Sequence, residues 1–311
     1  VCERFTIIMA TPTQNAALGM TFMLTATIFW SGLDVSAKYL IDVRGMPDLM
    51  VVWVRLAGGL VASYFVGVII DRRWDIWRVK RPLLQFLRSS AMMATTICNF
   101  IALGHLPVTT TISIFFCAPL ILAALSHPLL GEQVGRMRWT AILVGFVGVL
   151  MVMQPWGDQF SPWMLLAFGS AVFFALMQLT TRMLAAHDSA GSAVFYTTSV
   201  GAVALLPFLF LIEGKLALPA DGLSWALLLL VGMIFGTAGH MFNVLALHYA
   251  GPVRVAPLFY LAIVWSIVAQ ATLFGGGIDA FGMVGTAIII ASGLFVLWRE
   301  TRMMNRQAKP S

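Results

Sequence analysis

Long apolar runs follow one another along almost the whole chain, and they limit the fold more than any other feature. A run of roughly 20 apolar residues crosses the hydrocarbon core of a bilayer, which is about 30 Å thick. Ten runs of this kind lie at residues 18–41, 47–70, 83–103, 107–130, 137–153, 163–185, 191–212, 223–247, 252–274 and 281–298. The alternating strands of a lipid-facing barrel are not visible. The sequence therefore predicts an all-α polytopic membrane protein with ten transmembrane helices.

The low content of charged residues supports the same class. Of the 311 residues, 60% are hydrophobic and only 10% are charged. Soluble domains carry about 25% charged residues, so this chain cannot cover a globule with a charged surface. The net charge of +6 could suggest a nucleic-acid partner. Basic cytoplasmic loops of a membrane protein explain it better, and we expect no nucleic-acid partner.

Basic residues are distributed unequally between the two sides of the predicted membrane. If the N-terminus is cytoplasmic, the segments on that side hold 15 Lys and Arg residues and the opposite segments hold 3. The remaining one, Arg55, lies within a span. By the positive-inside rule, both termini are predicted to be cytoplasmic. The tails are residues 1–16 and 299–311.

An internal repeat divides the ten spans into two sets of five. Adding 144 to the residue number carries Asn99 to Asn243, and neighbouring residues follow with offsets of 144 or 145. The predicted repeats are 17–154 and 163–298, joined by the Pro- and Gly-containing loop 155–162. Because five is odd, the second repeat enters the membrane the other way up. Inverted repeats are typical of transporters, whose substrate site lies near the midplane where the repeats meet.

Trp30, Asp34 and Lys38 share one face of the first predicted helix, at intervals of four residues. The offset of 144 carries them to Phe174, Gln178 and Arg182. Charged groups at membrane depth usually face the bundle interior or a water-filled cavity. We therefore expect Trp30, Asp34 and Gln178 to bind substrate and Lys38 and Arg182 to take part in gating. The alternative is an Asp34–Lys38 ion pair near one surface, with Arg182 reaching the other.

Polar side chains also recur on the third and eighth predicted spans. Thr95 and Asn99 lie on the third, and His240 and Asn243 on the eighth. An amide both donates and accepts hydrogen bonds, which suits the ammonium and carboxylate of a zwitterion. Interhelical hydrogen bonding is the alternative. An unperturbed histidine changes charge near neutral pH, so His240 is a candidate for proton coupling, unless it is simply hydrogen-bonded within the bundle.

Prolines and aromatic residues mark the fourth and ninth predicted spans. Pro119 and Pro257 each remove a backbone hydrogen bond and permit a bend that could serve as a hinge. Phe115 and Tyr260 lie on the same spans and are expected to line an aromatic pocket. Static kinks and ordinary packing are the alternatives.

Motifs of enzymes and of nucleotide-binding proteins are absent from the sequence. There is no GxSxG, HExxH or P-loop pattern. The three cysteines show no spacing typical of a metal site or a disulfide framework. We expect no catalytic residue, no metal and no cofactor. Because a nucleotide-binding motif is missing, transport would be driven by a gradient or be facilitative, unless a separate subunit supplies the energy.

Residues 102–150 resemble the signature of the EamA-type branch of the drug/metabolite transporter superfamily. The residues that carry the resemblance are Ala102, Leu103, Pro107, Pro119, Leu130, Gly131, Glu132, Trp139, Gly145, Gly148 and Val149. Arg55 also resembles the Arg of the family's second helix. In the second repeat, Pro119 maps to Val264 and Glu132 to Gly277, so these positions cannot have symmetric roles.

The resemblance implies a multi-pass transporter of small metabolites in the bacterial inner membrane, commonly an amino-acid exporter. Other branches carry drugs or phosphorylated sugars, so the family alone names no substrate. A phosphate would require several mid-membrane cations, and only Arg55 is clearly placed there. We predict an alternating-access exporter of aromatic and neutral amino acids, monomeric or weakly dimeric.

Two rival functions remain open at this point. A proton-coupled multidrug or cation exporter would use Asp34 or His240, but Lys38 is close to Asp34 in sequence and would compensate its charge. A membrane protein that transports nothing is the other rival, because polar residues within a bundle can be purely structural.

Overall fold

The computed structural model describes residues 16–130, 136–157, 160–184, 187–213, 219, 221–275 and 279–307. Within these ranges every regular element is an α-helix or a short π-helical turn. The N-terminal half contains α2 (Ala16–Lys38), η1 (Tyr39–Val43), α3 (Asp48–Asp71), α4 (Pro82–His105), α5 (Val108–Phe115), α6 (Ala118–Leu130) and α7 (Arg136–Met153).

The C-terminal half is built in the same way. It contains α8 (Trp163–Leu184), α9 (Ala190–Phe208), η2 (Leu209–Glu213), α10 (Gly222–Leu229), η3 (Leu230–Phe235), α11 (Gly236–Phe259), α12 (Leu261–Ala269), η4 (Gln270–Phe274) and α13 (Ala280–Gln307). The prediction of an all-α fold is therefore confirmed for the described residues.

Seven helical segments are long and apolar enough to cross a membrane. They are Ala17–Val43, Asp48–Ile69, Pro82–His105, Val108–Leu125, Trp163–Thr181, Gly191–Leu211 and Gly222–Asn243. The shorter apolar helices are Trp139–Met153, Leu261–Phe274 and Ala280–Val296. Together the segments fall on the ten predicted stretches, which confirms the polytopic class. The count of ten crossings stays a prediction, as does the cytoplasmic location of the termini.

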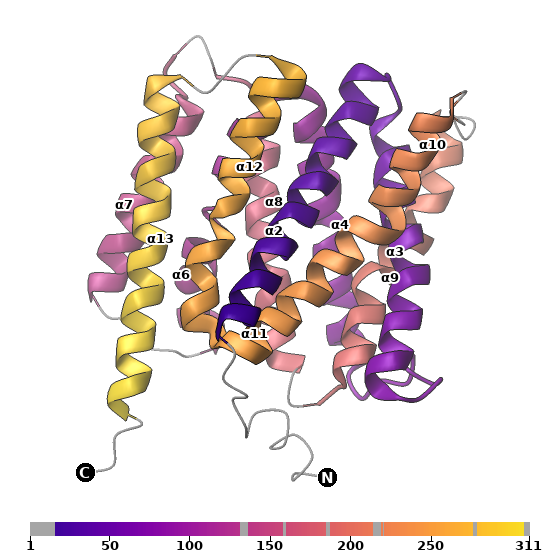
Figure 1. Ribbon diagram of the computed structural model, residues 1–311, viewed down its shortest axis with the longest axis horizontal. Helices are drawn as coiled ribbons and strands as arrows, with labels where there is room; N and C mark the ends of the chain where they lie inside the picture. Colours follow the sequence, from indigo (N-terminus) through magenta and orange to yellow (C-terminus); the bar gives the residue numbers. More distant parts are fainter. Residues whose placement is uncertain are drawn as a thin grey trace.

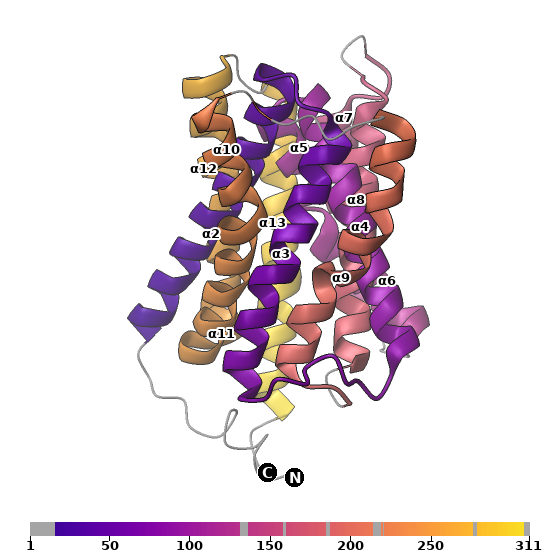
Figure 2. The same ribbon diagram turned by 90° about the vertical axis from the view of Figure 1, so that its right-hand side faces the viewer.

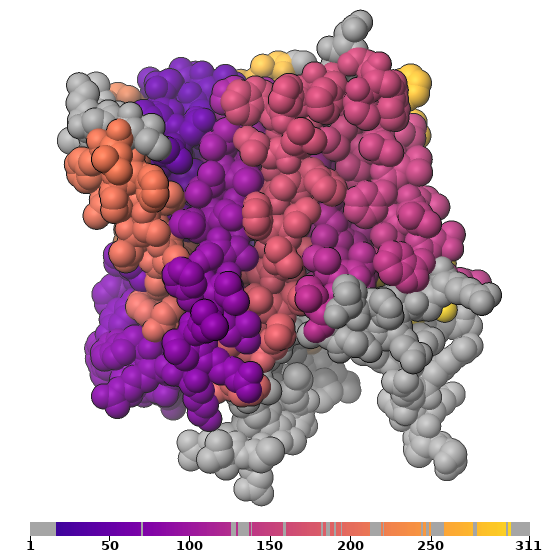
Figure 3. Space-filling view, turned by 180° about the vertical axis from the view of Figure 1, so that it is seen from behind, coloured from indigo at the N-terminus to yellow at the C-terminus, as the bar shows by residue number. Residues whose placement is uncertain are grey.

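Each main helix packs against a helix of the other repeat. The pairs are α2 with α11, α4 with α8, α3 with α9, and α7 with α13 (Figures 1 and 2). The repeat relates α2 to α8 and α4 to α11, so it converts the first pair into the second. It also relates α3 to α9 and α7 to α13, so each of these pairs corresponds to itself, as internal two-fold symmetry requires. Side chains of both repeats lie next to one another on the face in Figure 3. The beginning of α2 and the end of α13 lie at the same end of the molecule (Figure 1).

The surface is apolar and much of the polar chemistry is inside. Exposed side chains include Leu211 at 79% and Val203 at 70%, which suits contact with hydrocarbon. Thr and Ser hydroxyls are buried between helices, and so are the side chains of Arg55 and Arg88. This distribution is the reverse of that in a soluble protein, and it directs attention to the interior of the bundle.

Two helices are interrupted at equivalent positions in the two repeats. A turn at Phe116 and Cys117 separates α5 from α6, and Tyr260 separates α11 from α12. The offset of 144 carries Phe116 to Tyr260, and the two ring centroids lie 5.1 Å apart. Pro119 follows the first interruption, which agrees with the predicted bend; its role as a hinge stays a prediction. Interrupted helices at a repeat interface mark the binding region of many transporters.

Gly148 and Gly285 bring α7 and α13 into close contact. A Cβ atom on Gly148 would lie 2.7 Å from the Gly285 carbonyl oxygen, so we expect Gly148→Ala to force the helices apart. The cost of such overpacking is about 1–3 kcal/mol. The thermal unfolding midpoint in detergent should fall for Gly148→Ala. It should not fall for Gly222→Ala, where no atom lies within 4 Å. Equal midpoints would contradict this packing.

Candidate functional site

Two neighbouring cavities lie between the repeats. The first has a volume of about 120 Å³ and the second about 170 Å³. The first is lined by Trp30, Ser31, Leu33, Asp34, Arg55, Met92, Thr95, Thr96, Asn99, Phe100, Ile112, Phe115, Phe116, Phe174, His240, Phe259 and Ala262. The second is lined by Trp30, Ala118, Pro119, Leu122, Phe174, Ala175, Gln178, His240, Asn243 and Phe259.

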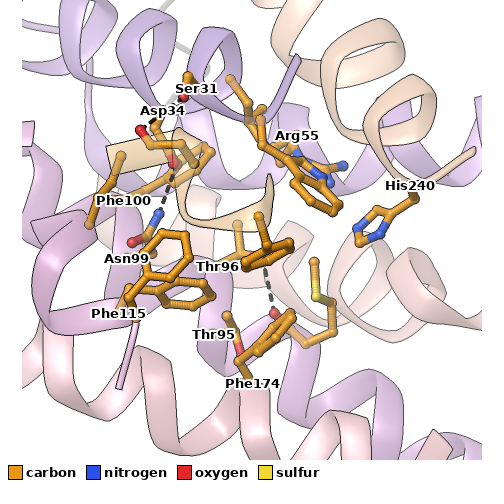
Figure 4. Close-up of a pocket in the computed structure, with 17 residues that line it drawn as sticks. Ser31, Asp34, Arg55, Thr95, Thr96, Asn99, Phe100, Phe115, Phe174 and His240 are labelled. Atoms are coloured by element: carbon orange, nitrogen blue, oxygen red, sulfur yellow. Dashed lines mark hydrogen bonds between the residues drawn. The ribbon is translucent and has the colours of Figure 1, made fainter. Parts of the chain in front are cut away.

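The first cavity contains a carboxylate held by an amide. Asn99 on α4 donates a hydrogen bond of 3.0 Å from Nδ2 to Oδ1 of Asp34 on α2 (Figure 4). The hydroxyls of Thr95 and Thr96 donate to carbonyls of their own helix, at 2.8 and 3.0 Å. Asp34 is therefore the only charged acceptor of the described lining, beside the neutral oxygens of the threonines and of Asn99.

Arg55 on α3 supplies the opposite charge to the same cavity. The residue is only 3% exposed, and among the described residues its guanidinium has no hydrogen-bond partner and no carboxylate at ion-pair distance. Gly236 makes room for it, because a Cβ atom there would lie 2.1 Å from Nη2. Figure 4 shows Arg55 and His240 toward one side of the cavity and Asp34 with Asn99 toward the other.

A second buried arginine, Arg88, differs from Arg55 because its guanidinium is hydrogen-bonded within the bundle. Arg88, 6% exposed, donates to the hydroxyls of Thr181 and Thr197 at 2.7 and 2.9 Å and to the Ala193 carbonyl. Leaving a buried charge without partners is costly, so Arg88 has a structural explanation. Arg55 has none, which makes it the stronger candidate for binding an anionic group. Sequence reasoning did not select it as a contact residue, although it is a rare cation within a span.

Aromatic rings line much of the same cavity. The centroid of Trp30 lies 5.1 Å from that of Phe259 and 5.6 Å from that of His240. Phe115 and Phe174 are 5.1 Å apart. A planar ring entering the cavity would meet these rings in the edge-to-face and offset geometries that aromatic groups prefer.

The second cavity is polar but uncharged. Gln178 and Asn243 line it, and neither amide has a hydrogen-bond partner among the described residues. Asp, Glu, Lys and Arg are absent from the described lining. Asn99 and Asn243, which the offset of 144 relates, line different cavities, and Trp30 and Phe174 line both.

The predicted substrate-binding residues divide between the cavities with one exception. Those on the first cavity are Trp30, Asp34, Thr95, Asn99, Phe115 and His240. Gln178 and Asn243, together with the predicted hinge Pro119, line the second. Tyr260 lines neither, because its ring packs against Phe116 and its hydroxyl lies close to Gly293. The substrate contacts themselves stay predictions.

Lys38 is paired differently from the alternative that the sequence left open. Its Nζ lies 3.0 Å from Asp42 and donates to the carbonyls of Leu103 and Leu106, also at 3.0 Å. The supposed ion pair with Asp34 is therefore wrong. A cation is favourable beside the carbonyl end of α4, where the helix dipole is negative. Lys38 anchors α2 to α4, and its role in gating stays a prediction.

Three other positions singled out in the sequence lie outside the part of the chain whose side chains are described. They are Glu132, Arg182 and Pro257. The roles predicted for Arg182 and Pro257 in gating stay predictions.

The helices form a polytopic membrane protein with two cavities between its repeats. The chain belongs to the EamA-like transporter family, which matches residues 17–154 and 161–298. The resemblance seen in the sequence is thereby confirmed. The protein is a transporter of the drug/metabolite type and a multi-pass membrane protein, in agreement with the predicted bacterial inner membrane.

Several relatives are bacterial transporters. The chain is 27% identical to an S-adenosylmethionine uptake transporter of Rickettsia conorii over 74% of this chain and 76% of the relative. It is 26% identical to a riboflavin transporter of Vibrio cholerae, over 93% and 96%. It is also 26% identical to a pseudopaline exporter of Pseudomonas aeruginosa, over 75% and 83%.

One solved protein structure shares the fold. Its TM-score is 0.61 at 16% identity, and the match covers 92% of this chain and 98% of the other. At this identity the likeness supports the architecture alone.

The anchoring contacts of Lys38 predict a stability effect. Lys38→Met removes a buried cation from two carbonyls and Asp42, and hydrogen bonds to a charged group contribute about 1.5–3 kcal/mol. The thermal midpoint in detergent should fall for this variant. It should stay unchanged for Lys80→Met, since Lys80 is exposed. Unchanged midpoints for both would show that the contacts contribute nothing.

Proposed function

We propose that this protein carries zwitterionic small molecules with a planar aromatic ring across the inner membrane. Aromatic and neutral amino acids and their derivatives form this class, and alternating access between the two repeats moves them. One observation carries the proposal: the unpaired guanidinium of Arg55 and the carboxylate of Asp34 line one cavity whose wall is aromatic.

Each charged group matches one end of an amino acid. Arg55 presents a planar set of donors that binds a carboxylate in two-point geometry. Asp34 accepts from an ammonium group, and the hydrogen bond from Asn99 fixes the position of its carboxylate. The two opposite charges line one cavity and attract each other, but they form no direct ion pair. A zwitterion would give each of them a directly bonded partner of opposite charge. A substrate with a single charge would satisfy one of them and disturb the balance between the two, at a considerable cost.

The names of the relatives support an aromatic ligand and leave the direction of transport to experiment. S-adenosylmethionine and riboflavin both contain a planar heteroaromatic ring, and the first is also an amino acid. One relative is named for uptake and another for export. We propose export, by a monomer or weak homodimer. Loading radiolabelled amino acid inside or outside proteoliposomes of known orientation tests the direction.

The two charges predict a crossover in ligand selectivity. Phenethylamine lacks the carboxylate of L-phenylalanine, and 3-phenylpropionate lacks its ammonium. Arg55→Gln should remove the preference for phenylalanine over phenethylamine, and Asp34→Asn the preference over phenylpropionate. Each change should be on the order of tenfold or more, as expected for a hydrogen bond to a charged group. Competition against labelled phenylalanine in proteoliposomes measures both.

The control for this crossover is Arg44→Gln. Arg44 is also an arginine, but it pairs with Asp221 at 3.0 Å and lines neither cavity. The order of affinities for the three ligands should therefore stay the same in this variant. If Arg55→Gln and Asp34→Asn change the inhibition constants of all three ligands by the same factor, the charges do not recognise the two ends of a zwitterion. The proposal then fails.

A proton-coupled exporter of lipophilic cations is the second candidate. Lys38 does not compensate Asp34, because it pairs with Asp42, and Asp34 faces the cavity. A membrane carboxylate without a direct ion pair suits both a cation and a proton.

This second candidate predicts a different phenotype for Asp34. Tetraphenylphosphonium flux should then require an imposed pH gradient and disappear in Asp34→Asn, because the carboxylate would exchange the proton for the cation. Measuring uptake into everted vesicles with and without the gradient distinguishes the two functions. Flux that ignores the gradient and survives the substitution would eliminate this candidate.

A further inference from the structure

The second cavity is the repeat-related counterpart of the first. The offset of 144 connects several residues of one lining with residues of the other. The pairs, with the member on the first cavity given first, are Ser31 and Ala175, Asp34 and Gln178, Asn99 and Asn243, and Ala262 and Ala118. Trp30 and Phe174 are also related by this offset, and both border both cavities. The chain thus holds two related versions of one cavity. The first has Asp34 and Asn99 of the first repeat, and the second has Gln178 and Asn243 of the second repeat.

The second cavity lacks the charges of the first. Gln178 stands in place of Asp34, and Asn243 in place of Asn99. Arg55 corresponds to Ser199, which does not line the second cavity and whose hydroxyl donates to the Phe195 carbonyl at 2.6 Å. A site with free amides and no described charged side chain favours neutral donors and acceptors, because a charged group there would lack compensation.

A layer of rings lies between the two versions. Trp30, Phe174, His240 and Phe259 line both cavities, so they form the boundary at which the cavities meet. A flat ring that stacks within this layer has one edge toward Asp34 and Arg55 and the other toward Gln178 and Asn243. The two ends of one ligand would therefore meet different chemistry.

We propose that the second cavity is a separate subsite for an uncharged, hydrogen-bonding heterocycle edge. The inference rests on the proposed function, since it assigns the charged part of the same substrate to the first cavity. The substrate class that fills both is an amino acid bearing a heterocycle with its own donors and acceptors, such as a purine. An amide side chain matches the donor and acceptor pattern of adenine with two hydrogen bonds.

Two probes separate the subsites. S-adenosylhomocysteine and L-phenylalanine share the amino-acid zwitterion, but only the first has a purine. Gln178→Leu and Asn243→Leu keep side-chain size and remove the amide. Each should raise the inhibition constant of S-adenosylhomocysteine by roughly fivefold or more, the usual effect of losing one hydrogen bond. The constant for phenylalanine should change less than twofold. Inhibition of labelled phenylalanine counterflow by purified, reconstituted protein measures both.

Thr180→Val is the matched control on α8. Its hydroxyl donates to carbonyls of its own helix at 2.9 and 3.0 Å, and the residue lines neither cavity. This variant should leave both constants unchanged.

Three results would overturn the subsite. The first is an equal rise of the inhibition constants of both ligands in Gln178→Leu and Asn243→Leu, and the second is no change in either constant. The third is that S-adenosylhomocysteine does not inhibit the unaltered protein. None of them affects the crossover expected at Asp34 and Arg55, so failure of the subsite and failure of the proposed function are distinguishable.

Discussion

Backbone polar groups cannot be left unpaired in lipid, and this constraint determines where the site lies. A helix can be interrupted at membrane depth only where protein or a cavity surrounds the break. Here the breaks at Phe116 and Tyr260 come from opposite repeats and face each other. Their neighbours Phe115 and Phe259 line the first cavity. The need to shield the two breaks and the existence of a binding site are thus consequences of one arrangement.

Compensation of charge then decides what the site can do. Arg88 and Lys38 are buried but have partners, so they stabilise the bundle. Arg55 and Asp34 face one cavity as opposite charges without a direct ion pair, so both remain available to a ligand. In the second repeat, Gln178 stands at the position related to Asp34. The repeats therefore pack symmetrically, but the side chains that line the two cavities differ in charge.

The class, the repeats and much of the site were predictable from the sequence. Apolar runs and a fixed offset are one-dimensional patterns, and they brought Trp30 and Asp34 into consideration without coordinates. The partner of Lys38 was not predictable, because Asp34 and Asp42 lie four residues away on either side. The choice depends on the carbonyls at the end of α4, far away in sequence. The lack of a hydrogen-bond partner for the Arg55 guanidinium was not predictable for the same reason. It depends on which groups other helices place around this side chain.

The position of a bound zwitterion tests the central claim most directly. A crystal structure with para-bromo-L-phenylalanine would locate the ring by the anomalous signal of bromine and the carboxylate by its density. We expect the ring among Trp30, Phe174 and Phe259, with the carboxylate within hydrogen-bond distance of Arg55. A bromine peak outside both cavities, or a carboxylate directed away from Arg55, would contradict recognition of a zwitterion by Arg55 and Asp34.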